Sequence, residues 1–193
     1  MRTIYILIFA FLVFGFSIVE KYPTECKKWG GVYLSSNSYL QKQLSDSVCV
    51  SDKRVCVYEG TLNKIVIKTG KEKRIFNPGE IFAYSDGENI YRYFQTSETM
   101  SPYGYFKIED TSGLIIYSQK HFSYRHSSTG YYYSESINGL IKILNIKNLE
   151  TDFANLTFVA EVKSLVESLK NKSTKKAMVS IREINAIFKK HNR

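Results

Sequence analysis

The sequence has few of the residues, and none of the motifs, from which common metal and redox sites are built. It contains three His and three Cys among 193 residues. No Cys-x-x-Cys pair is present, which argues against a zinc site or a thioredoxin-like redox site. His121 and His126 are five positions apart, so on a strand their side chains point to opposite faces. We therefore expect neither a metal site nor a cofactor.

The sequence motifs of several large enzyme classes are also absent. There is no Gly-x-Ser-x-Gly, no His-Glu-x-x-His and no Gly-rich phosphate loop ahead of a helix. The acidic residues Glu80, Asp86 and Glu88 fall at predicted turns, where carboxylates usually accept local hydrogen bonds. A non-catalytic protein is therefore expected. The alternative is a hydrolase acting on glycans, which needs two carboxylates facing one cleft.

The N-terminus has the pattern of an export signal. Met1 and Arg2 supply a short positive region, and residues 4–16 form an apolar run without charge. Gly15 and Ser17 supply small residues at the two positions that a signal peptidase reads, which predicts a cleaved signal peptide over residues 1–17. The alternative is a retained membrane anchor over residues 3–19, although that run is shorter than the ~20 residues a spanning helix needs. We expect export to the periplasm, the cell envelope or the medium.

Residues 75–94 contain the clearest local signal, a β-hairpin. Asp86 and Gly87 separate two β-favouring runs, and the loop has either two residues or four. Both registers give the same two faces, because side chains alternate along a strand. One face carries Phe82, Tyr84, Tyr91 and Tyr93, and the other carries Ile81, Ala83, Ile90, Arg92 and Phe94. Neither face is polar, so the hairpin belongs inside a larger sheet, with Arg92 paired to a carboxylate such as Glu80.

Similar β-favouring runs recur up to residue 144, without a long helical pattern between them. This spacing predicts an antiparallel β meander over residues 18–144, as a curled sheet or an open barrel. After Asn145 the apolar spacing becomes helical, and Ser180 with Glu183 resembles a capping box that opens the last helix. Residues 145–193 should therefore be helices packed on the sheet. The predicted fold class is α+β.

The three cysteines suggest one disulfide. Cys49 and Cys56 flank a short polar segment, and a four-residue loop there would place them opposite each other in a hairpin. That geometry is within reach of a disulfide, which an exported protein can keep. The alternative is a pair of small buried thiols. Cys26 stays unassigned.

Tyrosine is the most abundant aromatic residue, with 15 Tyr and 12 Phe against a single Trp. Five tyrosines at predicted sheet positions form a candidate binding face. They are Tyr84, Tyr91, Tyr93, Tyr105 and Tyr117. An exposed aromatic face stacks on sugar rings or on a partner protein. The alternative is ordinary packing within and between strands.

The net charge of +9 is concentrated at the C-terminus. Residues 170–193 contain eight basic residues, and Glu183 is the one acidic residue among them. Such a tail is attracted to anionic surfaces, and the alternative is a solvated Lys-rich helix. We expect no nucleic-acid partner.

Residues 79–84 (Gly-Glu-Ile-Phe-Ala-Tyr) and 90–94 (Ile-Tyr-Arg-Tyr-Phe) lie between a Gly-Val-Tyr-Leu strand at 31–34 and a Leu-Ile-Ile-Tyr strand at 114–117. This order, with a helical C-terminus, resembles a family of uncharacterised exported bacterial proteins. The resemblance implies export and a β-rich fold, and it implies no activity. Together with the residues, it predicts a binding or structural module of the bacterial cell envelope. Its partner would be a glycan, an anionic envelope surface or an envelope protein.

The leader can be tested directly. Protein secreted from a bacterial host should begin at Ile18, because the predicted cleavage follows Ser17. N-terminal sequencing and intact mass of the exported protein measure this. A membrane-bound product that keeps residues 3–19 would support the anchor, and a cytosolic product with an intact leader would contradict both.

Overall fold

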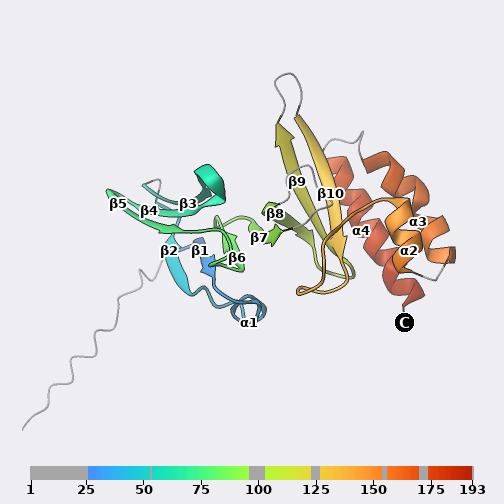
Figure 1. Cartoon of the computed structure of the whole chain (residues 1–193), viewed down its shortest axis with the longest axis horizontal. Coiled ribbons are helices and arrows are strands. Elements are labelled where there is room, and N and C mark those ends of the chain that lie inside the picture. Colours follow the sequence, from blue (N-terminus) through green and yellow to red (C-terminus); the bar gives the residue numbers. More distant parts are fainter. Residues whose placement is uncertain are drawn as a thin grey trace, which may run out of the picture.

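The computed structural model describes residues 26–52, 54–95, 103–122, 127–153, 156–169 and 174–192 (Figure 1). The predicted signal peptide and His126 lie outside these residues. The strands are β1 (Trp29–Tyr33), β2 (Asp46–Cys49), β3 (Val55–Glu59), β4 (Ile65–Thr69), β5 (Glu72–Phe76), β6 (Ala83–Ser85), β7 (Ile90–Gln95), β8 (Tyr103–Asp110), β9 (Ile115–Phe122), β10 (Ser127–Ser134) and β11 (Lys142–Ile143). The helices are α1 (Ser36–Leu40), the 3-10 turn η1 (Thr61–Asn63), α2 (Ile146–Asp152), α3 (Leu156–Ser168) and α4 (Thr174–His191).

Eight antiparallel strands form the main sheet, in the order β11-β10-β9-β8-β7-β6-β1-β2. β6 to β11 follow one another as a meander, while β1 comes from the start of the chain and lies between β6 and β2. β3, β4 and β5 form a separate small sheet. The main sheet is open, and helices follow it in the chain. The predicted α+β class with an antiparallel sheet is confirmed.

The hairpin of β6 and β7 is present with its longer loop. Ser85 pairs with Ile90, so residues 86–89 form a four-residue loop. The backbone N–H of Asp86 donates to the carbonyl of Asn89 at 3.2 Å. Gly87 has a φ of +93°, a conformation that favours glycine. The local turn residues therefore determined this hairpin.

The predicted position of Phe82 is wrong. Tyr84, Tyr91 and Tyr93 lie on one face as predicted, because they pack in the same cluster. Phe82, however, lies in a bend before β6, where strand alternation does not hold. As a result Ile81 packs with Tyr84, and Phe82 packs against the opposite face of the sheet.

The first face of the main sheet, defined by Tyr84, Tyr105, Ser118 and Tyr131, is covered by two different layers. Residues that pair directly across neighbouring strands lie on the same face of a sheet. The pairs that link these positions are Tyr84 with Tyr91, Tyr93 with Tyr105, Lys107 with Ser118, and Ser118 with Tyr131. At one end, Val57, Ile65 and Ile67 of the small sheet pack on Val32, Tyr84 and Tyr105. At the other end, Leu149, Phe158, Val162, Ile181 and Ile184 of the helices pack on Ile116 and Tyr133. Figure 1 shows the small sheet and the helices at opposite ends of the main sheet.

The second face of the main sheet carries a third apolar cluster. Its buried members are Phe94, Phe106, Ile115, Tyr117, Tyr132, Ile137 and Ile141. Partly buried side chains, among them Tyr39 of α1 and Phe82, pack against it. Both faces of the sheet are thus apolar and both need a cover.

Arg92 lies on this second face, and the predicted pairing with Glu80 is wrong. Arg92 is 6% exposed, and its Nη1 donates to the Tyr117 hydroxyl at 3.0 Å. Its guanidinium lies 3.9 Å from the centre of the Phe94 ring. Glu80 lies in a turn, where it accepts hydrogen bonds from the backbone and side-chain amides of Asn77. A cation–π contact therefore replaces the expected ion pair.

The predicted start of the last helix is also wrong. α4 begins at Thr174, so Ser180 lies inside it and its hydroxyl donates to the carbonyl of Lys176 at 3.5 Å. Residues 175–178 (Lys-Lys-Ala-Met) are good helix formers, and Ala177 among them is fully buried, so packing extends the helix by almost two turns ahead of Ser180.

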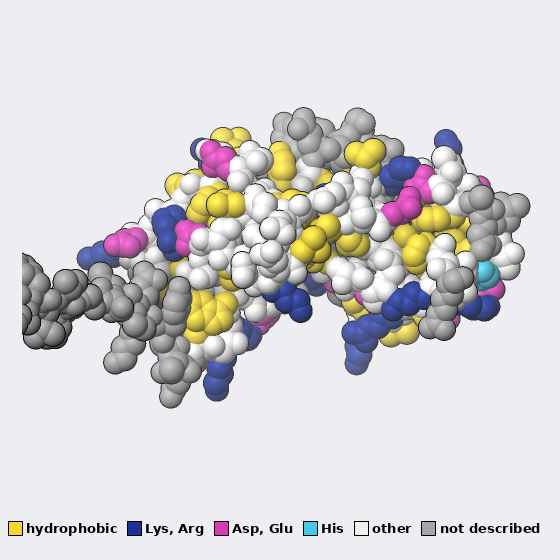
Figure 2. All heavy atoms as spheres, turned by 90° about the horizontal axis from the view of Figure 1, so that it is seen from below, with side chains coloured by type: hydrophobic (Ala, Val, Ile, Leu, Met, Phe, Trp, Pro, Cys, Tyr) yellow, Lys and Arg dark blue, Asp and Glu magenta, His cyan; other side chains and the backbone are white. Residues whose placement is uncertain are grey.

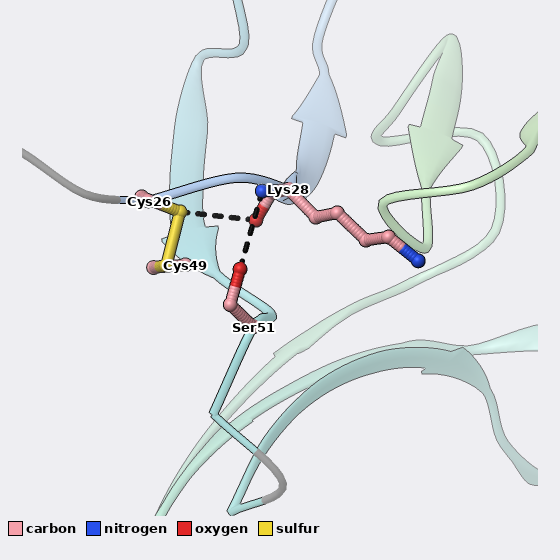
Figure 3. Close-up of a disulfide and its surroundings, with 4 residues drawn as sticks. All are labelled: Cys26, Lys28, Cys49 and Ser51. Atoms are coloured by element: carbon pink, nitrogen blue, oxygen red, sulfur yellow. Dashed lines mark hydrogen bonds between the residues drawn. A yellow bond between two sulfur atoms is a disulfide. The ribbon is translucent and has the colours of Figure 1, made fainter.

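The predicted disulfide between Cys49 and Cys56 is wrong. β2 and β3 belong to different sheets, so these two cysteines are not cross-strand neighbours. β2 pairs with β1, with Trp29 opposite Cys49, and this brings Cys26 to Cys49. Cys26 and Cys49 form the disulfide, with a Cα–Cα distance of 5.8 Å (Figure 3). Cys56 is unpaired and half-buried.

The pairing of β1 with β2 depends on a glycine. A Cβ atom at Gly31 would lie 2.0 Å from the carbonyl oxygen of Asp46, so a larger residue would push the strands apart. Beside the disulfide, the backbone N–H of Lys28 donates to the Ser51 hydroxyl at 3.2 Å (Figure 3). The Sγ of Cys26 lies 3.1 Å from the carbonyl oxygen of Lys28, which is a contact without a proton because a disulfide sulfur carries none.

We expect Cys26→Ser and Cys49→Ser each to lower the free energy of unfolding by about 3 kcal/mol, because the disulfide restricts the unfolded chain. Cys56→Ser should change it by less than about 1 kcal/mol. Urea unfolding of the oxidised proteins measures this. A large loss for Cys56→Ser with none for Cys26→Ser would contradict the pairing.

Candidate functional site

A cleft of about 510 Å³ lies on the first face of the main sheet, in the middle region between its two covering layers. Its lining residues are Glu59, Asn89, Tyr91, Tyr105, Lys107, Glu109, Ser118, Gln119, Lys120, Thr129 and Tyr131. The floor comes from the central strands β7 to β10, and Glu59 reaches it from the end of β3 in the small sheet. Ligand sites usually have volumes of about 300–1,000 Å³, so this cleft is large enough.

The structure brings four of the five predicted tyrosines together. Tyr84 stacks on Tyr91 with ring centres 4.7 Å apart, and Tyr105 contacts both Tyr84 and Tyr93 at 5.1 and 5.2 Å. Tyr91 and Tyr105 line the cleft. Tyr117 does not join them, because it is fully buried on the second face.

These tyrosine rings pack mainly against each other. Tyr84 and Tyr105 are almost completely buried, so the small sheet covers much of the predicted aromatic face. Burial, together with the nearby carboxylate of Asp86, raises the pKa of Tyr91 to about 12. Burial also raises the pKa of Tyr105, with a further contribution from the charge of Glu59. Both phenols therefore stay protonated near neutral pH and can donate hydrogen bonds.

Two residues that line the cleft, Tyr105 and Gln119, each have a buried polar atom without a hydrogen-bond partner among the described residues, the Tyr105 hydroxyl and the Gln119 Oε1. Tyr105 is 5% exposed, and its hydroxyl is buried without a hydrogen-bond partner among the described residues. A buried polar group left unpaired costs roughly 1–3 kcal/mol. A ligand group that reached and paired with the Tyr105 hydroxyl would remove that cost.

Two carboxylates line the cleft in different environments. Glu109 has a side chain that is 7% exposed, accepts a hydrogen bond from Ser118 at 2.6 Å and pairs with the Lys107 ammonium at 3.1 Å. Glu59 is exposed when the whole residue is considered. Its carboxyl group, however, is partly buried, and this burial raises the pKa of Glu59. The cleft therefore offers one carboxylate held by a cation and one that protonates more readily than an exposed glutamate.

Sequence reasoning missed the polar residues of the cleft. Tyr105, Lys107 and Glu109 alternate on β8, and this polar alternation on a strand rich in aromatic residues was the available signal. Glu59 gave no signal, because its place at the cleft depends on how the small sheet packs on the main sheet.

The loop of the central hairpin holds one wall of the cleft. The Asp86 carboxylate accepts hydrogen bonds from the backbone N–H groups of Glu88 and Asn89, at 2.8 and 2.7 Å. It also accepts one from the Tyr91 hydroxyl at 3.2 Å. Asp86 thus has the local role predicted for carboxylates at turns, and it orients a residue of the cleft.

A second hollow, of about 500 Å³, lies on the second face beside α1. Its lining residues are Tyr33, Tyr39, Leu40, Lys42, Ile90, Thr111, Ile115 and Ile137. On the side drawn in Figure 2, apolar side chains form several separate patches among polar ones. This hollow has fewer convergent polar groups than the cleft, so the cleft is the better candidate for a specific ligand.

Within the part of the chain that the structure describes, no group of three or more His, Cys, Asp or Glu could hold a metal ion. The helices in the same ranges are too short or too polar to cross a bilayer. Comparisons with protein-family models, with curated proteins and with solved structures find no match to this chain.

The Asp86 turn makes stability depend on pH. Burial alone would raise the pKa of Asp86, but the hydrogen bonds from Asn89, Glu88 and Tyr91 outweigh it and hold the pKa below the ordinary 3.8. A lowered pKa in the folded state means that the charged carboxylate stabilises the fold above pH 3.8, and that this contribution is lost as pH falls through the folded value.

We expect Asp86→Asn to lower the free energy of unfolding by roughly 0.5–1 kcal/mol at pH 7, since water screens this partly exposed group. The difference from the wild type should shrink below pH 3.8. Urea unfolding across this pH range measures it, with the exposed Glu150→Gln as the control. A difference that does not change with pH would contradict the role of the charge.

Proposed function

We propose that this protein is an exported, non-catalytic module of the bacterial cell envelope that binds a glycan in the cleft. The observation that carries the proposal is that Tyr105 lines the cleft while its buried hydroxyl has no hydrogen-bond partner among the described residues. A native fold rarely keeps such a group unless something else pairs with it.

The chemistry of the lining supports a ligand rich in hydroxyl groups. Lys107 and Lys120 are donors, Glu59 and Glu109 are acceptors, and a sugar hydroxyl can serve both kinds of group. Cations and carboxylates occur together in the lining, which favours a neutral ligand over a strongly charged one. Tyrosine rings at the cleft add apolar contact for the C–H faces of a sugar.

Two features support export. The N-terminal residues have the order of a signal peptide, with a positive start, an apolar run and small residues. The disulfide between Cys26 and Cys49 is of the kind that persists in oxidising compartments.

The binding proposal is tested with Tyr105→Phe, which removes the hydroxyl and keeps the ring. Because the hydroxyl has no partner among the described residues, the free energy of unfolding should stay equal or rise. Affinity for a soluble envelope oligosaccharide should fall about tenfold, the value of one hydrogen bond to a buried group. Isothermal titration calorimetry against a panel of such oligosaccharides measures this.

Tyr58→Phe is the matched control, because Tyr58 is 40% exposed on the small sheet and does not line the cleft. It should leave both affinity and stability unchanged. The proposal fails if no oligosaccharide binds saturably, or if Tyr105→Phe binds as tightly as the wild type.

One observation favours a second candidate, a glycan hydrolase. Glu59, whose pKa is raised by burial, and Glu109 both line the cleft, as an acid and a carboxylate of a glycosidase would. If wild-type protein releases new reducing ends from a bound oligosaccharide and Glu59→Gln binds it without cleavage, the hydrolase replaces the binding module.

A further inference from the structure

The solvent side of α4 carries a straight line of cations. Lys175, Arg182 and Lys189 are all exposed and follow one another at intervals of seven residues. Seven residues are about 20° short of two full helical turns, so the three side chains lie within about 40° of each other around the axis. Along the axis they span about 21 Å. We call these three residues the cationic ridge.

The cationic ridge points away from the rest of the protein. The buried residues of α4 include Ala177, Ile181 and Ile184, which pack in the cluster between the helices and the main sheet. Counted at about 100° per residue, their common direction lies about 130° around the axis from that of the ridge. The ridge therefore lies on the solvent side of α4, where all three cations are exposed.

The ridge is not neutralised by neighbouring carboxylates. None of its three cations makes an ion pair with another described residue, whereas the nearby Lys190 and His191 both pair with Glu161. Glu183, the acidic residue of α4, follows Arg182 directly and therefore points about 100° away from it.

Small apolar residues lie between the cations. Val179 is 63% exposed, and Ala186 is exposed as well. By the same angular count both lie within about 60° of the ridge. An exposed valine beside cations suits an interface where apolar and anionic groups occur together.

We propose that the cationic ridge docks the protein on an anionic lipid bilayer. A straight helix presents the whole ridge to a flat surface at once, and the three cations match the negative potential of anionic headgroups. Val179 then contacts the boundary between headgroups and acyl chains. This surface belongs to α4 and shares no residue with the lining of the cleft, so it is independent of the glycan proposal.

The test uses vesicles of phosphatidylglycerol and phosphatidylcholine in equal parts, with pure phosphatidylcholine as the neutral comparison. The variant K175E/R182E/K189E should lose affinity for the anionic vesicles by on the order of 100-fold, given about 1 kcal/mol for each cation at the surface. Added salt should release the wild-type protein. Co-sedimentation measures both effects.

The matched control is K27E/K71E/K73E, which changes the net charge equally at exposed positions far from α4 in the sequence. It should keep most of the binding. The milder K175Q/R182Q/K189Q, which leaves fewer repulsive charges, should lose affinity while its circular dichroism stays that of the wild type.

Three results would overturn the proposal. They are equal loss in the control and the α4 variants, equal binding to neutral vesicles, and no binding of the wild type to anionic vesicles. If an anionic polysaccharide binds the ridge and the vesicles do not, the partner is a polymer and the lipid assignment is wrong. Glycan binding in the cleft should survive in every variant.

Discussion

The whole structure depends on a main sheet that carries buried apolar side chains on both faces. Phe106 and Tyr117 on one face and Ile116 and Tyr133 on the other are all nearly or fully buried, so each face needs a cover to exclude water. Three groups of elements provide this cover. The small sheet covers one end of the first face, the helices cover the other end, and α1 with residues 137–141 packs on the second face.

The cleft forms because the two layers on the first face cover only its two ends. Since the small sheet and the helices cover the two ends of the same face, the strands between them carry polar residues, among them Lys107, Ser118 and Thr129. The same arrangement places Glu59, which ends the first strand of the small sheet, in the lining of the same cleft as Tyr105 of the main sheet. Ligands often bind in clefts between packed layers, because both layers contribute side chains to one concave surface.

The second face shows how a charge is accommodated without a carboxylate. Arg92 lies between the rings of Phe82 and Phe94 and donates to Tyr117, whose hydroxyl also bonds to Ser134 at 3.0 Å. Burial lowers the pKa of Arg92, while Tyr117 acts in the opposite direction. The rings of Phe82 and Phe94 and the Tyr117 hydroxyl thus stabilise the Arg92 guanidinium. From the sequence, an ion pair with a carboxylate was expected instead.

The sequence by itself determined the elements that depend on neighbouring residues. Asp86 and Gly87 specify a hairpin, Gly70 turns β4 into β5, and the change of apolar spacing near Asn145 marks the beginning of the helices. Only the tertiary structure decided which cysteine pairs with Cys49, which residue meets Arg92 and how Glu59 reaches the cleft. The reason is that β1 pairs with β2 and β6 over long sequence distances, and such pairings follow from the packing of whole layers, for which no short stretch of residues carries a signal.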